Sequence, residues 1–402
     1  MFHLTQECFT MQFDSIDKDS AAAGTIIKVI GVGGAGGNAI RHMVQEGVMG
    51  VDFIVANTDA QVLNSNPASI KISLGKLGAG GKPEAGKAAA EANREAIREQ
   101  ISGAHMVFIA AGMGGGTGTG AAPVIAEIAK EMGILTVGVV SRPFELEGQR
   151  RMNNAERGIT ELNQHVNSLI VIQNEKLLEV MGEEATQKAA YCMADDVLKN
   201  AVGGIVEIIT REGIVNVDFE DVRTVMSETG RAMMGSYTAV GADRASIATE
   251  QALASPLLEG VELTNAKGVV VNITGHSDSL RMVEVKNILA RVKACASDDA
   301  HIIYGAVYDD NMGDELRVTV VATGLGNNTM TIVPDPEPIG DELQQQGTGT
   351  HDSVIRDPSV LTALERKRLG QGNGVARSMR SGMAQGASSA GVIPAFLRRQ
   401  AD

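Results

Sequence analysis

The sequence has 402 residues, of which 44% are hydrophobic and 3% aromatic, so it can form two domains with largely aliphatic cores. Its formal net charge of −14 argues against a general nucleic-acid binder, which would present a basic face. The cysteines Cys8, Cys192 and Cys295 are widely spaced, which argues against a disulfide framework or a zinc site and indicates a reducing cytoplasm.

Residues 1–23 are polar and aperiodic, so we expect a disordered N-terminal arm, and they lack the pattern of a signal peptide. Over residues 24–185, apolar runs alternate with helical patterns. This alternation predicts an α/β fold, with a Rossmann-like parallel sheet covered by helices on both faces. Ligands bind such sheets at the carboxyl ends of the strands.

A longer helix is predicted over residues 186–212, because Val197, Ala201, Ile205 and Ile208 recur at helical spacing. Residues 213–333 mix further strands and helices and predict a smaller α+β domain. Residues 334–390 have the Pro, Gly, Gln and Ser content of a flexible linker. Residues 391–402 form an apolar and basic C-terminal peptide, which composition alone assigns equally to a frayed end or to a docking segment.

Two glycine-rich segments follow predicted strands. The first is GVGGAGGN, residues 31–38, and the second is GGGTGTG, residues 114–120, which we expect to precede a helix at Ala121. Glycine lets backbone N–H groups approach a ligand with no Cβ in the way. Successive N–H groups at a helix N-terminus bind anions, so this pattern predicts a di- or triphosphate site.

Two other phosphate motifs fit less well. Gly31, Gly33 and Gly36 match GxGxxG and leave open an NAD-dependent oxidoreductase, although no catalytic His, Tyr or Cys constellation follows. Gly81, Gly86 and Lys87 have the spacing of a P-loop, but Ala88 stands where Ser or Thr must bind Mg²⁺. We therefore reject the P-loop.

The segment GGGTGTG closely resembles the phosphate loop of the tubulin/FtsZ family of polymerising GTPases. Further matching segments are GVGGAGGNA, NTDAQ, LGAG, PFELEG, NVDFEDVRTVMSE, ELRVTVVATG and IPAFLRRQAD. They occur in the family's order and cover residue 26 to about residue 324, plus the C-terminal peptide. The resemblance implies a GTPase that cycles between GTP and GDP, with Mg²⁺ held through nucleotide and water and K⁺ as a further candidate ion.

The resemblance also implies roles for individual residues at matching positions. Glu147 and Arg151 would reach the ribose and nearby groups, and Tyr191 would stack on the base. Asn38 and Asp196, with its neighbour Asp195, would lie at the guanine edge. The residues expected to surround the phosphates are Gly33, Gly34, Ala35, Gly36, Gly37, Asn38, Gly114, Gly115, Gly116, Thr117, Gly118, Thr119 and Gly120.

An acidic stretch, residues 216–221, carries the expected catalytic residues Asn216, Asp218 and Asp221. The resemblance implies that this stretch enters the nucleotide site of the next subunit, where the two aspartates would orient the attacking water. From the residues alone, the same letters predict a helix N-cap with acids in the first turn. Both interpretations can hold together.

The C-terminal peptide resembles the family's partner-recognition segment, in which Ile393, Phe396 and Leu397 would dock in a groove. The implied partners are the membrane tethers FtsA and ZipA. Such a protein would work in the cytoplasm, as a ring on the inner face of the membrane at the division site. A GTP-binding scaffold with little hydrolysis remains an alternative, because the segment near Gly75–Gly80 is shorter than the family's loop.

Overall fold

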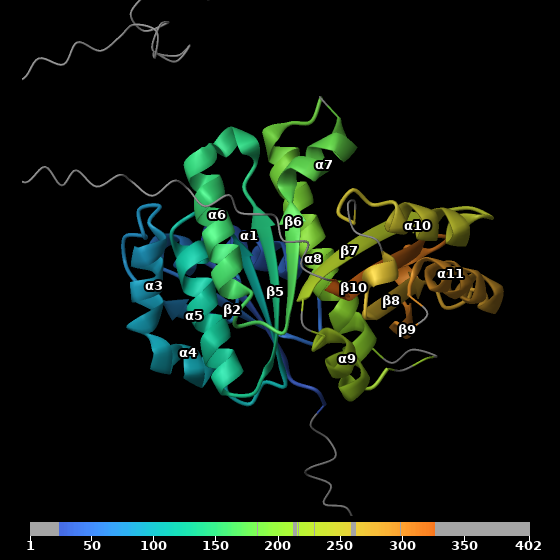
Figure 1. Cartoon of the computed structure of the whole chain (residues 1–402), viewed down its shortest axis with the longest axis horizontal. Coiled ribbons are helices and arrows are strands. Elements are labelled where there is room, and N and C mark those ends of the chain that lie inside the picture. Colours follow the sequence, from blue (N-terminus) through green and yellow to red (C-terminus); the bar gives the residue numbers. More distant parts are fainter. Residues whose placement is uncertain are drawn as a thin grey trace, which may run out of the picture. The chain divides into compact units, whose positions relative to one another are not determined.

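The structure is a computed structural model, and it describes residues 24–182, 184–211, 215, 217–228, 230–258, 263–297 and 299–325. Its strands form one ten-stranded sheet in the order β3-β2-β1-β4-β5-β6-β7-β10-β8-β9 (Figure 1). The first six strands in sequence are all parallel to their neighbours in the sheet. They are β1 (Ile27–Val32), β2 (Asp52–Asn57), β3 (Ile70–Ser73), β4 (Met106–Gly112), β5 (Leu135–Arg142) and β6 (Ser168–Gln173).

Helices cover both faces of this parallel region, as the alternating pattern predicts. They are α1 (Gly33–Gln45), α2 (Ala60–Asn64), α3 (Pro83–Glu91), α4 (Arg94–Ile101), α5 (Thr117–Glu131), α6 (Gln149–Leu162) and α7 (Asn174–Met181), with a short 3-10 turn, η1 (Glu145–Glu147). Successive residues of β1 enter different cores: Val29 packs with α1, and Ile30 packs with α4 and α5. This separation follows from the two-residue period of a strand.

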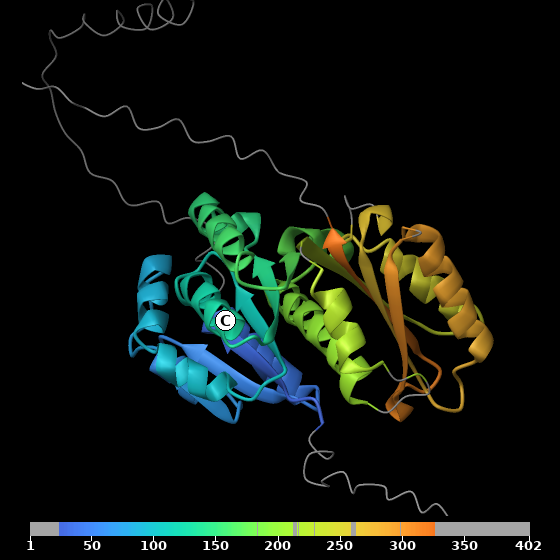
Figure 2. The same ribbon diagram turned by 60° about the horizontal axis from the view of Figure 1, so that its bottom comes forward.

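The long helix α8 (Gln187–Thr210) confirms the helix expected from the apolar spacing, and Thr186 caps its first turn by accepting from Ala189 N–H at 3.2 Å. Figure 2 shows α8 running between the two halves of the fold. The second half contains α9 (Phe219–Met226), β7 (Gly230–Ala239), α10 (Arg244–Leu253), β8 (Gly268–Gly275), α11 (Met282–Cys295), β9 (His301–Tyr308) and β10 (Leu316–Leu325).

The two halves share one sheet. Strand β7 pairs with β6 in parallel over three residue pairs and then pairs with β10 in antiparallel fashion. The expected α+β region is therefore an extension of the parallel sheet, with its own core beneath α10 and α11. The sequence did not reveal β7, which contains Gly235. A Cβ there would lie 1.9 Å from the carbonyl oxygen of Ala252, so glycine permits the close approach of α10.

One helix start differs from the sequence prediction, and another helical stretch is interrupted. The residues after Lys82 form two helices, α3 and α4, which are separated at Ala92 and Asn93, where the Asn93 amide donates to Ala89 O at 2.8 Å. Asparagine can bond to nearby backbone and so ends helices. Helix α5 begins at Thr117 rather than at Ala121, so the end of the second glycine segment is already helical.

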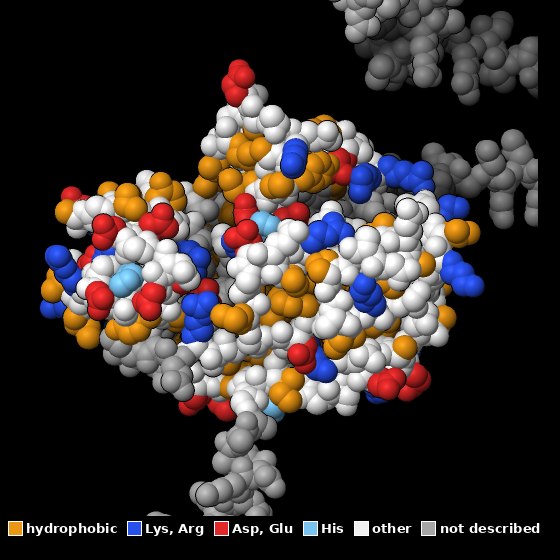
Figure 3. Space-filling model, turned by 180° about the vertical axis from the view of Figure 1, so that it is seen from behind, with side chains coloured by type: hydrophobic (Ala, Val, Ile, Leu, Met, Phe, Trp, Pro, Cys, Tyr) orange, Lys and Arg blue, Asp and Glu red, His pale blue; other side chains and the backbone are white. Residues whose placement is uncertain are grey.

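The surface and the cleft between the halves are both polar in part. Acidic and basic side chains are interspersed on the face seen from behind (Figure 3).

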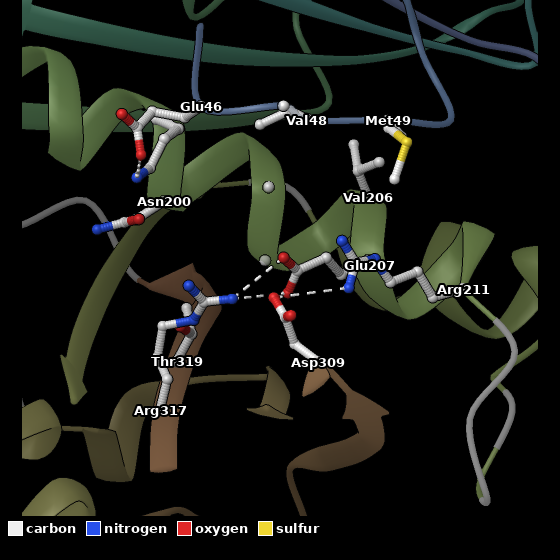
Figure 4. A pocket seen from close by; sticks show the side chains of 14 residues that line it. Glu46, Val48, Met49, Asn200, Val206, Glu207, Arg211, Asp309, Arg317 and Thr319 are labelled. Carbon is white, nitrogen blue, oxygen red and sulfur yellow. Dashed lines mark hydrogen bonds and ion pairs between the residues drawn. The ribbon is translucent and has the colours of Figure 1, made fainter. Parts of the chain in front are cut away.

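A cleft of about 200 Å³ lies between α8, the segment after α1, and β10 (Figure 4). There Arg317 contacts Glu207 at 3.1 Å, and Arg211 lies 3.8 Å from Asp309. Within the described ranges, no helix is long and apolar enough to cross a membrane.

Candidate functional site

The two glycine segments meet at one edge of the sheet. Strands β1 and β4 are neighbours, with Val32 opposite Ala111, and each leads into a helix that begins in its glycine segment. A Cβ on Gly33 would lie 2.8 Å from the backbone nitrogen of Gly118. The two segments therefore meet at the carboxyl ends of β1 and β4, which is where ligands bind in doubly wound sheets.

Most of these glycines are required by the packing of the protein itself. A Cβ on Gly36 would lie 2.3 Å from Ala110 O, one on Gly118 would lie 2.6 Å from Gly112 O, and one on Gly120 would lie 1.9 Å from Pro83 O. Gly114 has φ +96°, a conformation that side chains other than glycine rarely adopt. At these positions glycine is explained by close packing or by backbone conformation, so its presence there does not by itself indicate a ligand.

Gly34 and Gly115 have no such reason to be glycine. Neither has a positive φ, and a Cβ on Gly34 would meet nothing within 4 Å. A Cβ on Gly115 would have only an Arg151 guanidinium nitrogen nearby, at 3.9 Å. These two positions leave open space beside bare backbone at the N-terminal ends of α1 and α5, and a bound phosphate fits such a cradle.

The two threonines of the second segment differ in availability. Thr119 is buried, and its hydroxyl accepts from Gly114 N–H at 2.9 Å, so it braces the loop. Thr117 is partly exposed, and its hydroxyl oxygen lies 2.6 Å from that of Thr58, which follows β2. Thr117 is thus the hydroxyl of this segment that a ligand can reach.

The residues expected at the ribose and base form a second group. Arg151 Nη1 lies 2.7 Å from Glu147 Oε2, and the opposite oxygen of Glu147 accepts from Phe144 N–H at 3.0 Å. The ring of Tyr191 packs edge-on against Phe144 with centroids 5.2 Å apart. Burial, followed by the nearby Glu147 carboxylate, raises the pKa of Tyr191. The structure therefore brings η1, α6 and α8 together around one half-exposed aromatic ring.

The two adjacent acids on α8 lie in different surroundings. Asp196 Oδ1 is 2.7 Å from His42 Nε2 on α1, and the Asp196 side chain is 41% exposed. Burial raises the pKa of Asp195 to about 6. Asn38, one helical turn before His42, accepts from Arg41 at 3.2 Å. Helix α1 thus begins with glycines of the first segment and contacts Asp196 through His42, nine residues after Gly33.

The acidic stretch lies away from this group. Asp218 caps α9 by accepting from Asp221 N–H at 2.9 Å, which confirms the predicted N-cap. Phe219 packs against His105, which immediately precedes β4, with centroids 6.1 Å apart. Because the glycine segment follows β4, α9 and the glycines lie at opposite edges of the sheet, and Figure 1 shows α9 on the side away from α7. Asn216 is outside the described residues.

Two polar groups at this edge of the sheet are not among the residues predicted from the sequence. Thr58 is 3% exposed and contacts Thr117. Asn174 directly follows β6 and is 5% exposed, and its Oδ1 has no hydrogen-bond partner in the described part of the chain. Both residues stand at the carboxyl ends of parallel strands. Once the strands are assigned from the sequence, polar residues at these positions can be recognised as candidate ligand-binding residues.

Comparison with known proteins identifies this arrangement. The model of the Tubulin/FtsZ family, GTPase domain, matches residues 26–182, and that of the FtsZ family, C-terminal domain, matches residues 230–326. The chain belongs to the tubulin/FtsZ family. It is therefore a GTPase of the cell-division type.

Relatives match over almost their whole length. The chain is 48% identical to the cell division protein FtsZ of Wigglesworthia glossinidia brevipalpis over 97% of this chain and 100% of that protein. It is 48% identical to the cell division protein FtsZ of Pseudomonas putida, over 96% and 99% of the two chains. The solved structure of an empty FtsZ dimer from M. jannaschii superposes with a TM-score of 0.72 at 43% identity, covering 76% of this chain and 90% of that one.

A more distant structure shares the fold alone. A GTPγS-bound protofilament of CetZ2 from Haloferax volcanii superposes with a TM-score of 0.62 at 20% identity, covering 75% of this chain and 94% of that one. The conclusion about family therefore rests on the FtsZ relatives and on the two family models.

Proposed function

We propose that this GTPase polymerises head to tail into filaments that form the division ring, and that each active site is completed by the acidic stretch of the next subunit. The observation that carries this proposal is the separation of α9 from the glycine segments. They lie at opposite edges of the sheet, since His105 precedes β4 and Gly114 follows it. The seven residues of β4 span roughly 20 Å, too far for Asp221 to reach its own chain's phosphates.

Head-to-tail stacking brings these two edges together. An interface that joins different surfaces of identical subunits, and does not close into a ring, produces a filament. The FtsZ dimer and the CetZ2 protofilament are assemblies of this kind of fold and support self-association. In such a filament, the first turn of α9 would face the γ-phosphate held by the neighbouring subunit.

The nucleotide would bind along the carboxyl edge. Backbone N–H groups around Gly34 and Gly115, with the hydroxyl of Thr117, would hold the phosphates, while Tyr191 would stack on the guanine. Mg²⁺ would be held through nucleotide oxygens and water, and K⁺ would help to neutralise the negative charge of the phosphates. Asn174, whose Oδ1 has no hydrogen-bond partner among the described residues, would accept a hydrogen bond from the ligand.

Hydrolysis then needs a positioned water. Asp218 and Asp221 would accept hydrogen bonds from the water that attacks the γ-phosphate, and Asn216 would help to align it. The N–H groups of the glycine segments and the metal ion would stabilise the charge that develops on the phosphoryl oxygens. A subunit without a neighbour lacks the acidic residues that would position the water.

The other regions would serve the filament. Residues 24–185 would bind GTP, residues 186–212 would link them to residues 213–333, and residues 334–390 would tether the peptide 391–402. Ile393, Phe396 and Leu397 would engage FtsA and ZipA, which bring the filament to the inner face of the membrane in the cytoplasm. The arm 1–23, the tether and the peptide lie outside the described residues.

Phosphate release from GTP, measured against protein concentration in Mg²⁺ and K⁺, tests this mechanism. We expect a threshold concentration followed by a steep rise, and an Asp221→Ala variant that binds GTP but is nearly inactive. Glu220→Ala is the matched control, because Glu220 lies in the same turn and pairs with Arg223. Activity proportional to concentration down to dilute protein would contradict the shared site. Filaments without phosphate release would favour the scaffold alternative.

A further inference from the structure

A histidine outside the predicted site contacts the acid expected to read guanine. His42 Nε2 lies 2.7 Å from Asp196 Oδ1, and the two side chains are 24% and 41% exposed. His42 lies four residues after Asn38 on α1, so the two side chains share one face of the helix. The contact therefore connects the helix that starts at the phosphates with the helix that carries Asp196.

The donor in this contact is fixed by its chemistry. A carboxylate oxygen accepts and does not donate, so the proton of the hydrogen bond is on His42 Nε2. Lys199 is the second cation near Asp196, and its Nζ lies 3.8 Å from the same Oδ1. In the described part of the chain no partner is found for Oδ2. His42 thus holds one oxygen of the carboxylate and leaves the other free.

Guanine presents two parallel donors, N1–H and the 2-amino group. A carboxylate can accept both, one on each oxygen, and each oxygen has room for a second hydrogen bond. We propose that His42 is a positioning residue for base specificity, which fixes the rotamer of Asp196 so that its carboxylate faces this pair of donors. This inference rests on the proposed binding of GTP with Asp196 at the guanine edge.

The alternative is that His42 only ties α1 to α8. The chain offers a control for that role, because Glu46 follows His42 by one helical turn and lies 3.7 Å from Lys199 on α8 (Figure 4). Glu46→Gln weakens a tie between the same two helices and removes no direct contact of Asp196, although Glu46 and Asp196 share Lys199 as a neighbour. A variant that merely loosens the helices should therefore resemble Glu46→Gln.

Competitive binding of GTP and XTP to the full chain separates these possibilities. Xanthine has a carbonyl oxygen in place of the 2-amino group, so a correctly held carboxylate rejects it. We expect His42→Leu to reduce the preference for GTP by about tenfold, because Asp196 loses the hydrogen bond that orients it. His42→Gln, which keeps an N–H donor, should retain most of the preference, and Glu46→Gln should retain it fully.

Asp196→Asn distinguishes failure of this inference from failure of the function on which it rests. If the amide variant shifts the preference toward XTP while His42→Leu leaves it unchanged, the positioning role of His42 is wrong. If Asp196→Asn leaves the preference unchanged, the assignment of Asp196 to guanine is itself wrong. Unfolding measured for every variant without nucleotide shows whether a changed preference accompanies loss of the fold, and equal changes in His42→Leu and Glu46→Gln would overturn the proposal.

Discussion

The ring of Phe219 packs against His105 with centroids 6.1 Å apart, which places the start of α9 beside the amino end of β4. The glycine segment begins at the other end of the same strand. The length of β4 therefore separates the glycine segment from the acidic start of α9, both of which are expected to act in hydrolysis. Each subunit presents the glycine segment at one edge of the sheet and α9 at the other.

Mixing two inactive variants should restore activity. Asp221→Ala keeps its nucleotide site, and Gly115→Val keeps its acidic stretch while filling the cradle. In filaments formed at random from equal amounts, about a quarter of the interfaces would join an intact nucleotide site to an intact α9. Phosphate release by the mixture should exceed that of either variant alone. A mixture as inactive as its components, although both variants enter filaments, would argue for a site within one subunit.

Alanine at Gly34 and at Gly120 should affect different properties. At Gly34 a Cβ meets nothing within 4 Å, so the free energy of unfolding without nucleotide should change by less than about 1 kcal/mol. Affinity for GTP should nevertheless fall at least about tenfold, because the methyl group occupies the place of a phosphate oxygen. At Gly120 a Cβ would lie 1.9 Å from Pro83 O, so the fold itself should be destabilised.

Chemical denaturation and nucleotide titration of both variants check this difference. Equal loss of stability in the two variants would show that Gly34 serves packing rather than a ligand. An unchanged affinity of Gly34→Ala for GTP would remove the assignment of the cradle to phosphate.

The partly buried carboxyl of Asp195 predicts a pH dependence of stability. Burial raises its pKa from 3.8 to about 6 in the folded chain, so between these values the folded state binds more protons than the unfolded state. The contribution of Asp195 to the free energy of unfolding therefore falls as pH rises through this window. Asp195→Asn should stabilise the nucleotide-free protein by on the order of 1–2 kcal/mol at pH 7 and change little below pH 4.

Urea denaturation at a series of pH values measures this effect, with Asp196→Asn as the comparison. The Asp196 carboxylate accepts from His42, so its replacement should not stabilise the protein. A gain in stability from Asp195→Asn that is equally large at pH 4 and pH 7 would show that titration of this carboxyl is not the cause.

The ion pair across the cleft should support the joint between the two halves. Glu207 on α8 contacts Arg317 on β10 at 3.1 Å and also accepts from Asn272 at 3.0 Å. The Glu207 and Arg317 side chains are 18% and 24% exposed, so removal of Glu207 leaves a largely desolvated guanidinium. Glu207→Ala should lower the free energy of unfolding by about 1–3 kcal/mol. Removing both partners in Glu207→Ala/Arg317→Ala should cost less than the sum of the single changes.

Local patterns in the sequence determined much of this protein. Alternating apolar runs and helical spacing predicted the parallel sheet and α8, because side-chain periodicity depends only on the local backbone. The glycine segments predicted a phosphate site, since a strand, bare backbone and a helix start follow one another in the chain. The acids of α9 predicted a helix cap, which Asp218 confirms.

Relations between distant residues were decided by the tertiary structure alone. The sequence contains no sign that β7 joins both halves in one sheet, because that pairing depends on how β6, β10 and α10 pack. Nor does it separate Gly34, which faces open space, from Gly120, which packs against Pro83. The contact between His42 and Asp196 joins residues 154 positions apart. Such distances follow from close packing of the whole chain, and no local pattern encodes them.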